Sequence, residues 1–458
     1  MKDFLYQLKN TIKKIAPSFL LDWYHFSLVF LAALAYGFPS KKLKVIGVTG
    51  TSGKSTVLEM TSNILEKAGC KVASLSSIRF RLAGKEEPNN LRMTLPGRFF
   101  VQKFLRKAVN CGCEYAVLEI TSEGIKQYRH FFIDFKAVAL TNLSPEHIEA
   151  HGSFEKYKEA KGKLFQAAKN IHIINIDDEN AEYFLKFPSK QKFYYGLNNN
   201  LKIGKYPAEL GISRPEARKL EIDCKLKIEN CKFIKATDVN TSSSGINFKV
   251  ENTAFYLHLL GGFNIYNALT AISIARSQGI SLETCRLGLE RFRGVSGRME
   301  KVIDASFKAF VDYAITPNAL EKAYQTLIGN YKTDTNSLIC VLGSCGGGRD
   351  KWKRPVLGEI ASRYCDRIIL TNEDPYDEDP NEILSMIKEG VFKTDFNKNN
   401  FYEIIDRRQA IKKGLELAGL NDIFIITGKG CEPSMCLAGG RQITWDDRLA
   451  VREEFASL

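Results

Sequence analysis

The sequence predicts an α/β protein built on a mostly parallel sheet, and three features of its 458 residues support this prediction. Short apolar runs end in glycine-rich turns, as in KLKVIGVTG at residues 42–50. Such runs alternate with segments of helical periodicity, the pattern of strands that helices cover on both faces. The chain is also too long for a single hydrophobic core, so we expect two or three domains.

Three segments are expected. Residues 1–43 form an apolar helical segment, and residues 44–295 form a P-loop-type domain with a mostly parallel sheet. Within the latter, from about residue 190 to 260, short alternating runs such as KLEIDCKLKI (219–228) predict a small antiparallel β subdomain. Residues 296–458 return to buried runs followed by loops, which predicts a Rossmann-like C-terminal α/β domain.

The amino-acid composition of the chain indicates which classes of ligand it favours. Lys and Arg number 65 against 52 Asp and Glu, a net charge of +13 that favours anionic ligands such as nucleotides and phosphorylated precursors. No basic tract carries interleaved aromatic residues, so nucleic acid is not a predicted partner. The 11 cysteines include no C-x-x-C pair, which indicates neither a zinc ribbon nor a dithiol redox site and fits a reducing cytosol.

The apolar stretch FLLDWYHFSLVFLAALAYGF at residues 19–38 is about as long as a membrane span. Asp22 and His25 interrupt it, and no small-residue cleavage site follows, so a signal peptide is not predicted. We favour an apolar helix packed on the next domain; a helix on the membrane surface and a true span stay open. The flanking basic residues are Lys2, Lys9, Lys13, Lys14, Lys41, Lys42 and Lys44.

The strongest local signal is the glycine-rich loop GVTGTSGKST at residues 47–56. Its glycines let backbone N–H groups approach phosphate oxygens, and the helix start that follows adds a favourable dipole. Lys54 would neutralise the β and γ phosphates, and the Ser55 hydroxyl can bind Mg²⁺. The predicted nucleotide contacts are Gly50, Thr51, Ser52, Gly53, Lys54, Ser55 and Thr56.

This loop resembles that of the Mur ligases and folylpolyglutamate synthetases, and within that group the similarity to muramyl-tripeptide synthetases is greatest. The resemblance runs from about residue 44 to the C-terminus, with several motifs in the expected order. It implies an enzyme that uses ATP and Mg²⁺ to add an amino acid to a UDP-N-acetylmuramoyl-peptide-like precursor of peptidoglycan. The implied route is an acyl phosphate, with release of ADP and phosphate.

Three motifs imply a catalytic and metal site. LEITSE (118–123) resembles E-V-S-S-H, whose Glu, here Glu119, binds Mg²⁺. The segment 141–152 is similar to T-N-L-x-x-D-H-L-D-x-H and implies His147 as a metal ligand. The family's carbamylated lysine matches Lys161, whose pKa must be depressed because only a neutral amine attacks CO₂. An ion-paired Glu119, a core histidine and a solvated helix lysine stay open as alternatives. The implied catalytic residues are Lys54, Glu119, His147 and Lys161, and the metal ligands are Ser55, Glu119, His147 and Lys161.

Further motifs imply the remaining nucleotide contacts. GFNIYN (262–267) resembles G-x-F-N-x-x-N, which implies that Asn264 and Asn267 lie at the adenine end. Arg298, in a match to P-G-R-M-E, and Asp312, in a match to V-D-Y-A-H-T-P, inherit phosphate and ribose contacts.

Motifs in the last domain bear on the identity of the incoming amine. The segment NEDPY (372–376) stands where diaminopimelate-adding members carry D-N-P-R, so Tyr376 replaces an arginine. A bidentate fork for the far carboxylate is then missing, which argues against diaminopimelate. Lysine or another amine fits better, with Glu432 or Glu373 pairing its ammonium group. The implied substrate contacts are Thr121, Ser122, Arg129, Glu373, Asp374, Tyr376, Gly428 and Glu432.

One departure leaves alternatives open. Family members of this type carry an N-terminal uridine-binding domain, whereas only about forty residues, apolar and helical, precede the loop here. Either this chain binds the uridine nucleotide of the precursor in a different way, or the precursor is linked to a lipid and not to UDP. A folylpolyglutamate- or polymer-type ligase and a non-catalytic, membrane-associated ATP-binding module are the other functions considered. We expect a cytoplasmic monomer, with contact at the inner face of the membrane through residues 18–38 as an open alternative.

Overall fold

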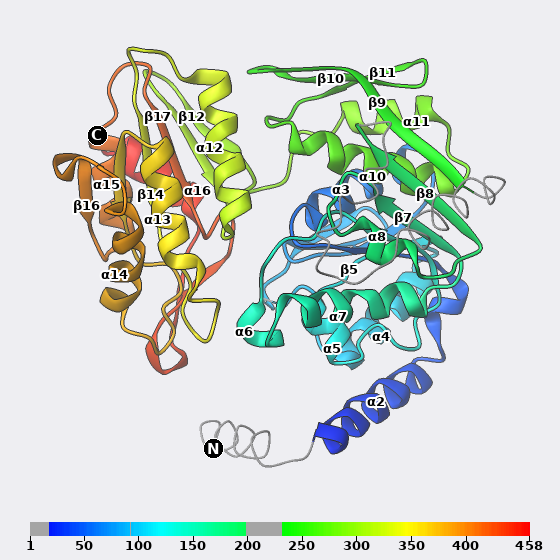
Figure 1. Cartoon of the computed structure of the whole chain (residues 1–458). Coiled ribbons are helices and arrows are strands. Elements are labelled where there is room, and N and C mark those ends of the chain that lie inside the picture. Colours follow the sequence, from blue (N-terminus) through cyan, green and yellow to red (C-terminus); the bar gives the residue numbers. More distant parts are fainter. Residues whose placement is uncertain (1–17, 92, 198–230) are drawn as a thin grey trace, which may run out of the picture.

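The computed structural model describes residues 18–91, 93–197 and 231–458 and arranges them around two large sheets (Figure 1). An eleven-stranded sheet organises the first half of the molecule, residues 18–290. A six-stranded sheet organises the second half, residues 300–456. With helices on both faces of each sheet, the predicted α/β class is confirmed.

The first sheet has the strand order β11-β10-β9-β8-β7-β6-β1-β5-β2-β3-β4. Its central strands, from β9 to β2, are parallel, and both edges are antiparallel. The carboxyl ends of the parallel strands therefore meet at one edge, where ligands bind in such sheets. The strands are β1 (Lys44–Thr49), β2 (Val72–Leu75), β3 (Arg79–Leu82), β4 (Lys85–Pro88), β5 (Tyr115–Glu119), β6 (Phe135–Leu140), β7 (Ile171–Asn175), β8 (Gln191–Gly196), β9 (Cys231–Ser242), β10 (Gly245–Val250) and β11 (Thr253–Leu257).

Helices cover the two faces of this sheet in separate groups. Helices α3 (Lys54–Lys67), α10 (Phe263–Ser277) and α11 (Leu282–Glu290) share one hydrophobic core. Helices α4 (Arg98–Asn110) and α7 (Phe154–Ala167) share the other, on the opposite face. The shorter elements of this half are η1 (Pro39–Lys42), α5 (Ser122–Lys126), α6 (Ile148–His151) and α8 (Ala181–Leu185).

The expectation of a separate antiparallel subdomain over residues 190–260 is partly wrong. Strand β8 pairs in parallel with both β7 and β9, so it belongs to the main sheet. Strands β9, β10 and β11 are antiparallel as expected, but they extend the same sheet because β9 continues its ladder. The run at residues 219–228 lies outside the described residues.

The second sheet has the order β12-β13-β17-β14-β15-β16 and is parallel except for its edge strand β12. Its strands are β12 (Glu300–Asp304), β13 (Lys308–Asp312), β14 (Leu338–Leu342), β15 (Arg367–Leu370), β16 (Phe401–Glu403) and β17 (Ile423–Thr427). Its helices are α12 (Pro317–Tyr331), α13 (Lys353–Tyr364), α14 (Pro380–Val391), α15 (Arg407–Glu416) and α16 (Asp447–Ala456). Strands β18 (Ser434–Cys436) and β19 (Gln442–Thr444) form a hairpin, and η4 (Lys398–Asn400) and η5 (Ala438–Gly440) are single turns.

Local sequence explains where key helices start. Helix α12 begins at Pro317, whose missing N–H costs nothing in the first turn. The Thr316 side chain caps the same helix by accepting from the Ala319 N–H. Ser153 caps α7 in the same way, through the Lys156 N–H. These caps orient α12 beside the second sheet and α7 beside the first.

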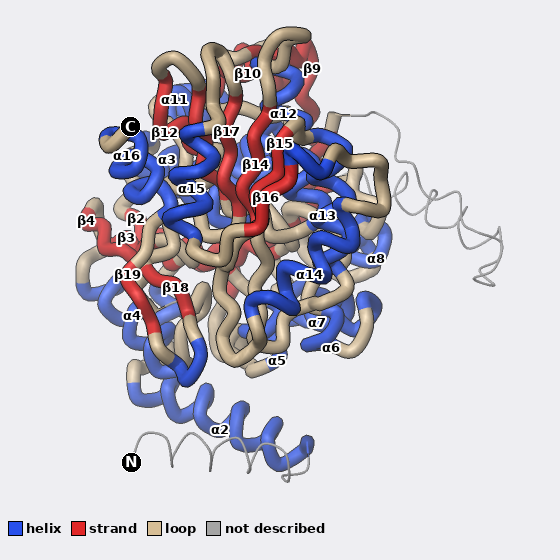
Figure 2. The backbone as a smooth tube through the Cα atoms, turned by 90° about the vertical axis from the view of Figure 1, so that its left-hand side faces the viewer, coloured by secondary structure: helices blue, strands red, loops and turns tan. Residues whose placement is uncertain are grey.

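Helix α2 (Ser18–Ala35) lies on the outside of the first half, against α4 (Figure 2). The Arg106 guanidinium donates to the Tyr36 carbonyl at 2.6 and 2.8 Å and to the Gly37 carbonyl at 3.0 Å. These bonds satisfy carbonyl groups just beyond the end of the helix. Across the described ranges, no helix is long and apolar enough to cross a membrane.

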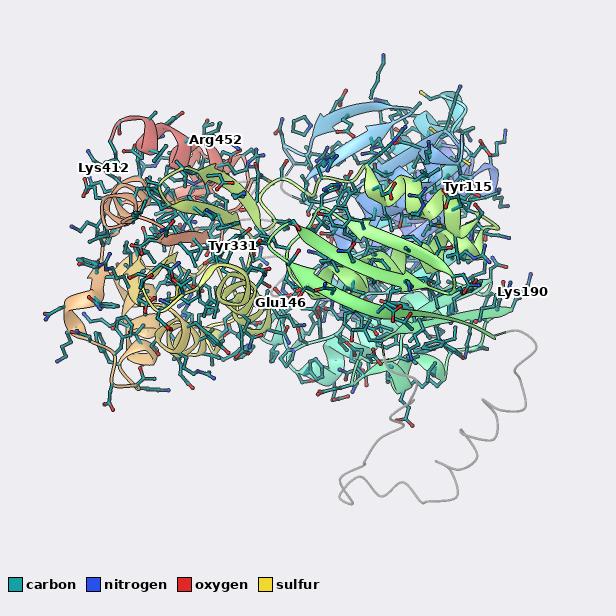
Figure 3. All side chains as sticks on the ribbon, turned by 90° about the horizontal axis from the view of Figure 1, so that it is seen from above. Tyr115, Glu146, Lys190, Tyr331, Lys412 and Arg452 are labelled. Atoms are coloured by element: carbon teal, nitrogen blue, oxygen red, sulfur yellow. A yellow bond between two sulfur atoms is a disulfide. The ribbon has the colours of Figure 1, made fainter. Side chains whose placement is uncertain are left out.

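The two halves meet along a narrow junction, with Glu146 at its edge in the view of Figure 3. The Tyr331 hydroxyl of α12 donates to the Ser243 carbonyl of the β9–β10 turn at 3.3 Å. The loop that follows β14 contacts helix α6 of the first half. The carboxyl edges of the two sheets therefore share one space.

A disulfide joins Cys340 of β14 to Cys365 at the end of α13. The two cysteines are 25 positions apart and belong to a strand–loop–helix unit, so this pair is close only because the helix packs back on the sheet. The scattered cysteines of the sequence did not predict it, and disulfides are uncommon in a reducing cytosol.

Candidate active site

The glycine-rich loop between β1 and α3 is shaped by close backbone approaches. Gly50 has a φ of 149°, and a Cβ there would lie 1.9 Å from the Thr141 hydroxyl. Gly53 has a φ of 81°, and its Cβ would lie 2.3 Å from the Asn267 amide oxygen. Neither position tolerates a side chain, because both the backbone conformation and the space exclude one. The two glycines therefore allow the loop to lie close to Thr141 and Asn267, directly before the first turn of α3.

Lys54 lies over this loop. Its ammonium group donates to the Gly50 carbonyl at 3.1 Å and to the Thr51 carbonyl at 2.8 Å. The Ser52 N–H donates to the Asn142 side chain at 2.9 Å, which ties the loop to the segment after β6. The ammonium group is thus within reach of a phosphate in the loop.

Glu119 and Ser55 meet at the carboxyl ends of β5 and β1. The Ser55 hydroxyl donates to the Glu119 carboxylate at 2.8 Å, and the Ser77 N–H donates to the same oxygen at 3.1 Å. Glu119 is almost fully buried and forms no salt bridge within the described part of the chain, so the ion-pair alternative finds no support there. Sequence reasoning missed Ser77, because no motif marks it.

Lys161 lies directly beneath the loop. It is only 1% exposed, so the alternative of a solvated helix lysine is wrong. Its ammonium nitrogen donates to the Gly50 carbonyl at 2.8 Å and lies 4.6 Å from the centre of the Tyr157 ring. Burial lowers the pKa of Lys161 well below its usual value, and the nearby Lys54 charge lowers it further. A neutral amine in this position can react with CO₂.

His147 stands at the entrance to the same region. It has a left-handed backbone with a φ of 55°, and its ring lies 6.1 Å from the Tyr157 ring. Burial lowers the pKa of His147, although Glu146 opposes this shift, so its imidazole is neutral near pH 7. A neutral imidazole is the form that binds metals.

The described residues contain no cluster of three or more His, Cys, Asp or Glu side chains arranged around a metal ion. Mg²⁺ typically takes one or two carboxylates and completes its shell with water and substrate phosphates. Ser55 and Glu119 beside the loop match that smaller donor set. A carbamate on Lys161 would add an anionic oxygen close to the Lys54 ammonium, where the charges are complementary.

The residues expected at the far end of the nucleotide fall into two groups. Asn267 donates to Asn264 at 2.8 Å in the first turns of α10, and Asn267 faces Gly53 of the loop. Arg298 and Asp312 belong to the second half, where Arg298 stacks on the Tyr313 ring at 4.0 Å. Burial raises the pKa of Asp312, while Arg298 lowers it. The two groups lie on opposite sides of the junction.

A cavity of about 90 Å³ lies between the halves. The first half contributes Glu146 and His147 to its wall. The remaining lining side chains come from the second half, and six of them are acidic or basic residues. Those charged residues are Arg349, Asp350, Lys353, Glu373, Asp374 and Glu432, with Tyr313, Ile315, Ser344, Cys345 and Tyr376 as uncharged neighbours.

The acidic groups of this cavity are organised around Lys429. Its ammonium group donates to Asp374 at 2.8 Å and to Glu432 at 2.5 Å. The Tyr313 hydroxyl also donates to Glu432, at 2.9 Å. Burial raises the pKa of Glu373 to about 7, although Arg407 and Lys429 lower it. A basic ligand group near Glu373 would favour its ionised form.

Tyr376 closes one side of the cavity. Its backbone is left-handed, with a φ of 53°, and its ring lies so close to Gly347 that a Cβ there would be 2.6 Å away. Burial raises the pKa of its hydroxyl, so the side chain is neutral. Tyr376 therefore presents a neutral ring to the cavity.

Four of the expected substrate residues do not line this cavity: Thr121, Ser122, Arg129 and Gly428. The Thr121 hydroxyl caps α5, and the Ser122 hydroxyl pairs with His151 at 3.1 Å. Arg129 donates to Gln127 at 2.6 Å and to the Leu95 carbonyl. The cavity instead contains Glu146 and Arg349, which sequence reasoning quoted within motifs but did not assign.

Two family models match the chain. The Mur ligase middle domain matches residues 48–275, and the Mur ligase, glutamate ligase domain, matches residues 297–430. A UDP-N-acetylmuramoyl-L-alanyl-D-glutamate--2,6-diaminopimelate ligase of Syntrophomonas wolfei is 34% identical over 432 residues, covering 93% of this chain and 81% of the relative. A UDP-N-acetylmuramyl-tripeptide synthetase of Roseiflexus sp. is 31% identical over 450 residues, with coverage of 93% and 81%.

Solved structures agree with this assignment. That of a UDP-N-acetylmuramoyl-L-alanyl-D-glutamate--2,6-diaminopimelate ligase has a TM-score of 0.56 and 28% identity, covering 91% of this chain and 78% of that chain. The Mycobacterium tuberculosis folylpolyglutamate synthase, solved with ADP and AMPPCP, has a TM-score of 0.64 at 16% identity, covering 93% and 95%. At that identity the second similarity shows the fold alone.

Proposed function

The chain belongs to the Mur ligase family, and from that premise we propose that it adds an amino acid to a UDP-N-acetylmuramoyl-peptide-like precursor of peptidoglycan, using ATP. The relatives' names supply the substrate class, since they are ligases and synthetases of UDP-N-acetylmuramoyl peptides. The observation that carries the proposal is the position of Lys54, Glu119 and Lys161 around one glycine-rich loop, at the edge of a charged cavity.

The proposed reaction has two steps. The precursor carboxylate attacks the γ-phosphorus of ATP, so a C–O–P bond forms while the bond to the β-phosphate oxygen breaks and ADP leaves. The neutral amine then attacks the acyl carbon, and phosphate leaves from the tetrahedral intermediate. Lys54 and the loop N–H groups stabilise the charge on the transferred phosphoryl group, and catalysis is mainly positioning and electrostatics.

Ser55 and Glu119 are the proposed Mg²⁺ ligands, with His147 and carbamylated Lys161 at a second ion. The bound ions would neutralise phosphate charge. The buried, neutral Lys161 amine supports carbamylation, since the modification converts a neutral amine beside the Lys54 charge into an anion. The loop residues 50–56, Asn264, Asn267, Arg298 and Asp312 would hold the nucleotide.

Three segments are proposed as functional units: residues 1–43, residues 44–295 and residues 296–458. The gap between the two family matches, from residue 275 to residue 297, supports the boundary near residue 295. Because nucleotide contacts are proposed on both halves, closure of the junction would assemble the site around ATP.

The amine is proposed to be lysine or a similar diamine. Glu373 and Glu432 lie in the cavity wall as partners for a second ammonium group. Tyr376 has no charge to offer a distal carboxylate. Several relatives are named as diaminopimelate ligases. The incoming amine is therefore the main difference that we propose between this chain and those enzymes. Asp374 lies in the same wall, and Gly428 packs against the Glu373 side chain. Thr121, Ser122 and Arg129 would face the precursor.

We propose that the chain acts as a cytoplasmic monomer, with peripheral contact to the inner face of the membrane through residues 18–38. The exposed apolar side chains of α2 support that contact.

Phosphate release from ATP tests the proposed function. We expect release only when a UDP-N-acetylmuramoyl dipeptide and an amine are both present, with lysine above diaminopimelate and glutamate. Lys54→Ala should abolish release, whereas Lys71→Ala, at the opposite end of the neighbouring strand β2, should not change it. ATP binding without release under every combination would indicate a non-catalytic module. Release with folate or polymer acceptors alone would indicate the other ligase branch.

A further inference from the structure

Helix α2 is apolar on two opposite faces, and the body of the protein covers only one of them. Val29, Ala32 and Ala33 are buried. The rings of Phe26 and Phe30 each lie 5.4 Å from the Phe132 ring of the first half. A helix that is apolar all round is normally buried all round, so the uncovered face calls for a partner.

The uncovered face is a continuous stripe. Trp23 is 70% exposed, Leu34 is 55% exposed and Leu31 is 50% exposed. At 100° per residue, the members of the stripe fall within a sector of about 100°, and Val29 lies about 180° from Leu20. We call these side chains the α2 stripe: Leu20, Trp23, Tyr24, Leu31 and Leu34.

The stripe is held outward by fixed contacts on the other side of the helix. Arg106 of α4 binds the carbonyls of Tyr36 and Gly37 directly after α2, and Phe132 packs against the covered face. Figures 1 and 2 both place α2 on the outer edge of the first half, away from the second half. The stripe can therefore meet a large flat partner without disturbing the junction.

Charge identifies the partner as a lipid surface. Lys41 and Lys42 are exposed immediately after α2. The 17 residues before it contain four lysines and one acidic residue: Lys2, Lys9, Lys13, Lys14 and Asp3. Lysines on both sides of an apolar helix attract anionic headgroups, and Trp and Tyr favour the boundary between headgroups and acyl chains. A second copy would bring the two lysine groups together, where they repel.

We propose that the α2 stripe lies in the interface of an anionic bilayer, with the helix axis parallel to the membrane plane. Trp23 and the leucines would enter the acyl boundary, and Lys41 and Lys42 would bind headgroups. The α2 stripe is the surface that would make the peripheral membrane contact proposed above for residues 18–38. Its binding to lipid does not depend on the ligase reaction. The finding that none of the described helices qualifies as a membrane span is compatible with this in-plane position.

Vesicle flotation of the full chain tests the proposal. Wild-type protein should float with vesicles that contain phosphatidylglycerol, less with pure phosphatidylcholine, and less as salt rises. The double substitution Trp23→Glu/Leu31→Glu should lower the bound fraction about tenfold or more. Lys41→Glu/Lys42→Glu should remove the preference for anionic vesicles. Leu420→Glu/Leu449→Glu, at equally exposed positions of the second half, should change nothing.

Folding and activity are followed separately. Circular dichroism melting should show that Trp23→Glu/Leu31→Glu is folded, because both side chains are exposed. Its phosphate release in the absence of vesicles should equal that of the wild type, so loss of the proposed ligase function would be recognised independently. Wild-type protein that fails to float with either vesicle, or floats equally after substitution of the stripe, would overturn the proposal. So would a dimer in analytical ultracentrifugation that the double substitution dissociates.

Discussion

Glu149 and Asp350 bind each other's segments across the junction between the two halves. The Glu149 N–H donates to the Asp350 carboxylate at 3.0 Å, and the Glu149 carboxylate accepts from the Lys351 N–H at 2.6 Å. Glu149 follows His147 by two residues, and Asp350 lines the cavity beside Arg349. The pair therefore links the proposed metal side of the site to the proposed amine side.

Substitution of Glu149 tests this link. We expect Glu149→Ala to lower kcat/KM for the amine by about tenfold, mainly through KM, because the loop that lines the cavity loses its anchor. ATP affinity should be unchanged, and Glu149→Gln should restore part of the loss because the amide oxygen still accepts. Initial rates over an amine series measure both constants.

The matched control for that experiment is Glu155→Ala. Glu155 is exposed and pairs only with Lys158 among the contacts described. If Glu149→Ala and Glu155→Ala give the same amine KM, the link between the halves has no role in positioning the amine.

Lys161 should show the chemistry of a neutral amine. Burial lowers its pKa well below the usual value, so the amine is free to take up CO₂ until the pH falls through that lowered pKa. We expect activity to drop in CO₂-depleted buffer, more steeply at low pH, and to return with bicarbonate. Intact-protein mass spectrometry should find the added carboxyl group.

Two variants accompany this measurement. Lys161→Ala should reduce phosphate release by about a hundredfold or more, since a charge beside the loop is lost. Lys163→Ala, two residues along and exposed, should behave like wild type. Full activity of Lys161→Ala, or indifference of the wild type to bicarbonate, would refute the proposed role.

Tyr376 should determine the choice of amine. Tyr376→Arg would place a guanidinium in the cavity wall, and we expect kcat/KM for diaminopimelate to rise by about tenfold while that for lysine falls. Tyr402→Arg, on edge strand β16 and outside the cavity, is the control. A wild type that already prefers diaminopimelate, with no response to Tyr376→Arg, would show that the distal carboxylate is recognised elsewhere.

His130 should make stability depend on pH. Its ring is buried, and neither nitrogen has a hydrogen-bond partner among the described residues. Burial lowers its pKa from 6.5 to about 4, so between these values the unfolded chain binds more protons than the folded one. The free energy of unfolding should therefore rise with pH across this window and fall as the pH drops to 4, by at most about 3 kcal/mol.

Denaturant unfolding between pH 4 and pH 7 measures this dependence. His130→Leu should reduce the slope, because leucine takes up no proton in either state. The part due to His172, whose pKa burial also lowers to about 4, should remain. His258→Leu, at a less buried site, should leave most of it in place. An unchanged slope in His130→Leu would assign the acid sensitivity to other groups.

Short-range patterns allowed much of the fold to be predicted. The apolar run before Gly50 and the helix after Gly53 lie where the loop motif placed them, because strand, turn and helix are set by neighbouring residues. The antiparallel strands over residues 231–257 were also expected, but not that they extend the main sheet. Pairing between β8 and β9 involves residues far apart in the chain, and periodicity carries no information about it.

In the candidate site, too, some residues follow from sequence motifs and others depend on long-range packing. A motif identified Lys161 and favoured it as the carbamylated lysine, yet its neighbours Lys158 and Lys163 kept a solvated lysine open as an alternative. Its burial arises where α7 packs under the loop of another element. Ser77 has no motif and enters the site only because the segment after β2 lies beside β5.

By itself, then, the sequence determined the phosphate loop, the alternation of strands and helices and the family, since each follows from residue type at fixed spacing. Only the tertiary structure decided which face of α2 is covered, that Lys161 is buried, and that Glu149 meets Asp350. Those features depend on packing between segments up to 200 residues apart, where burial and electrostatic environment are properties of the assembled fold.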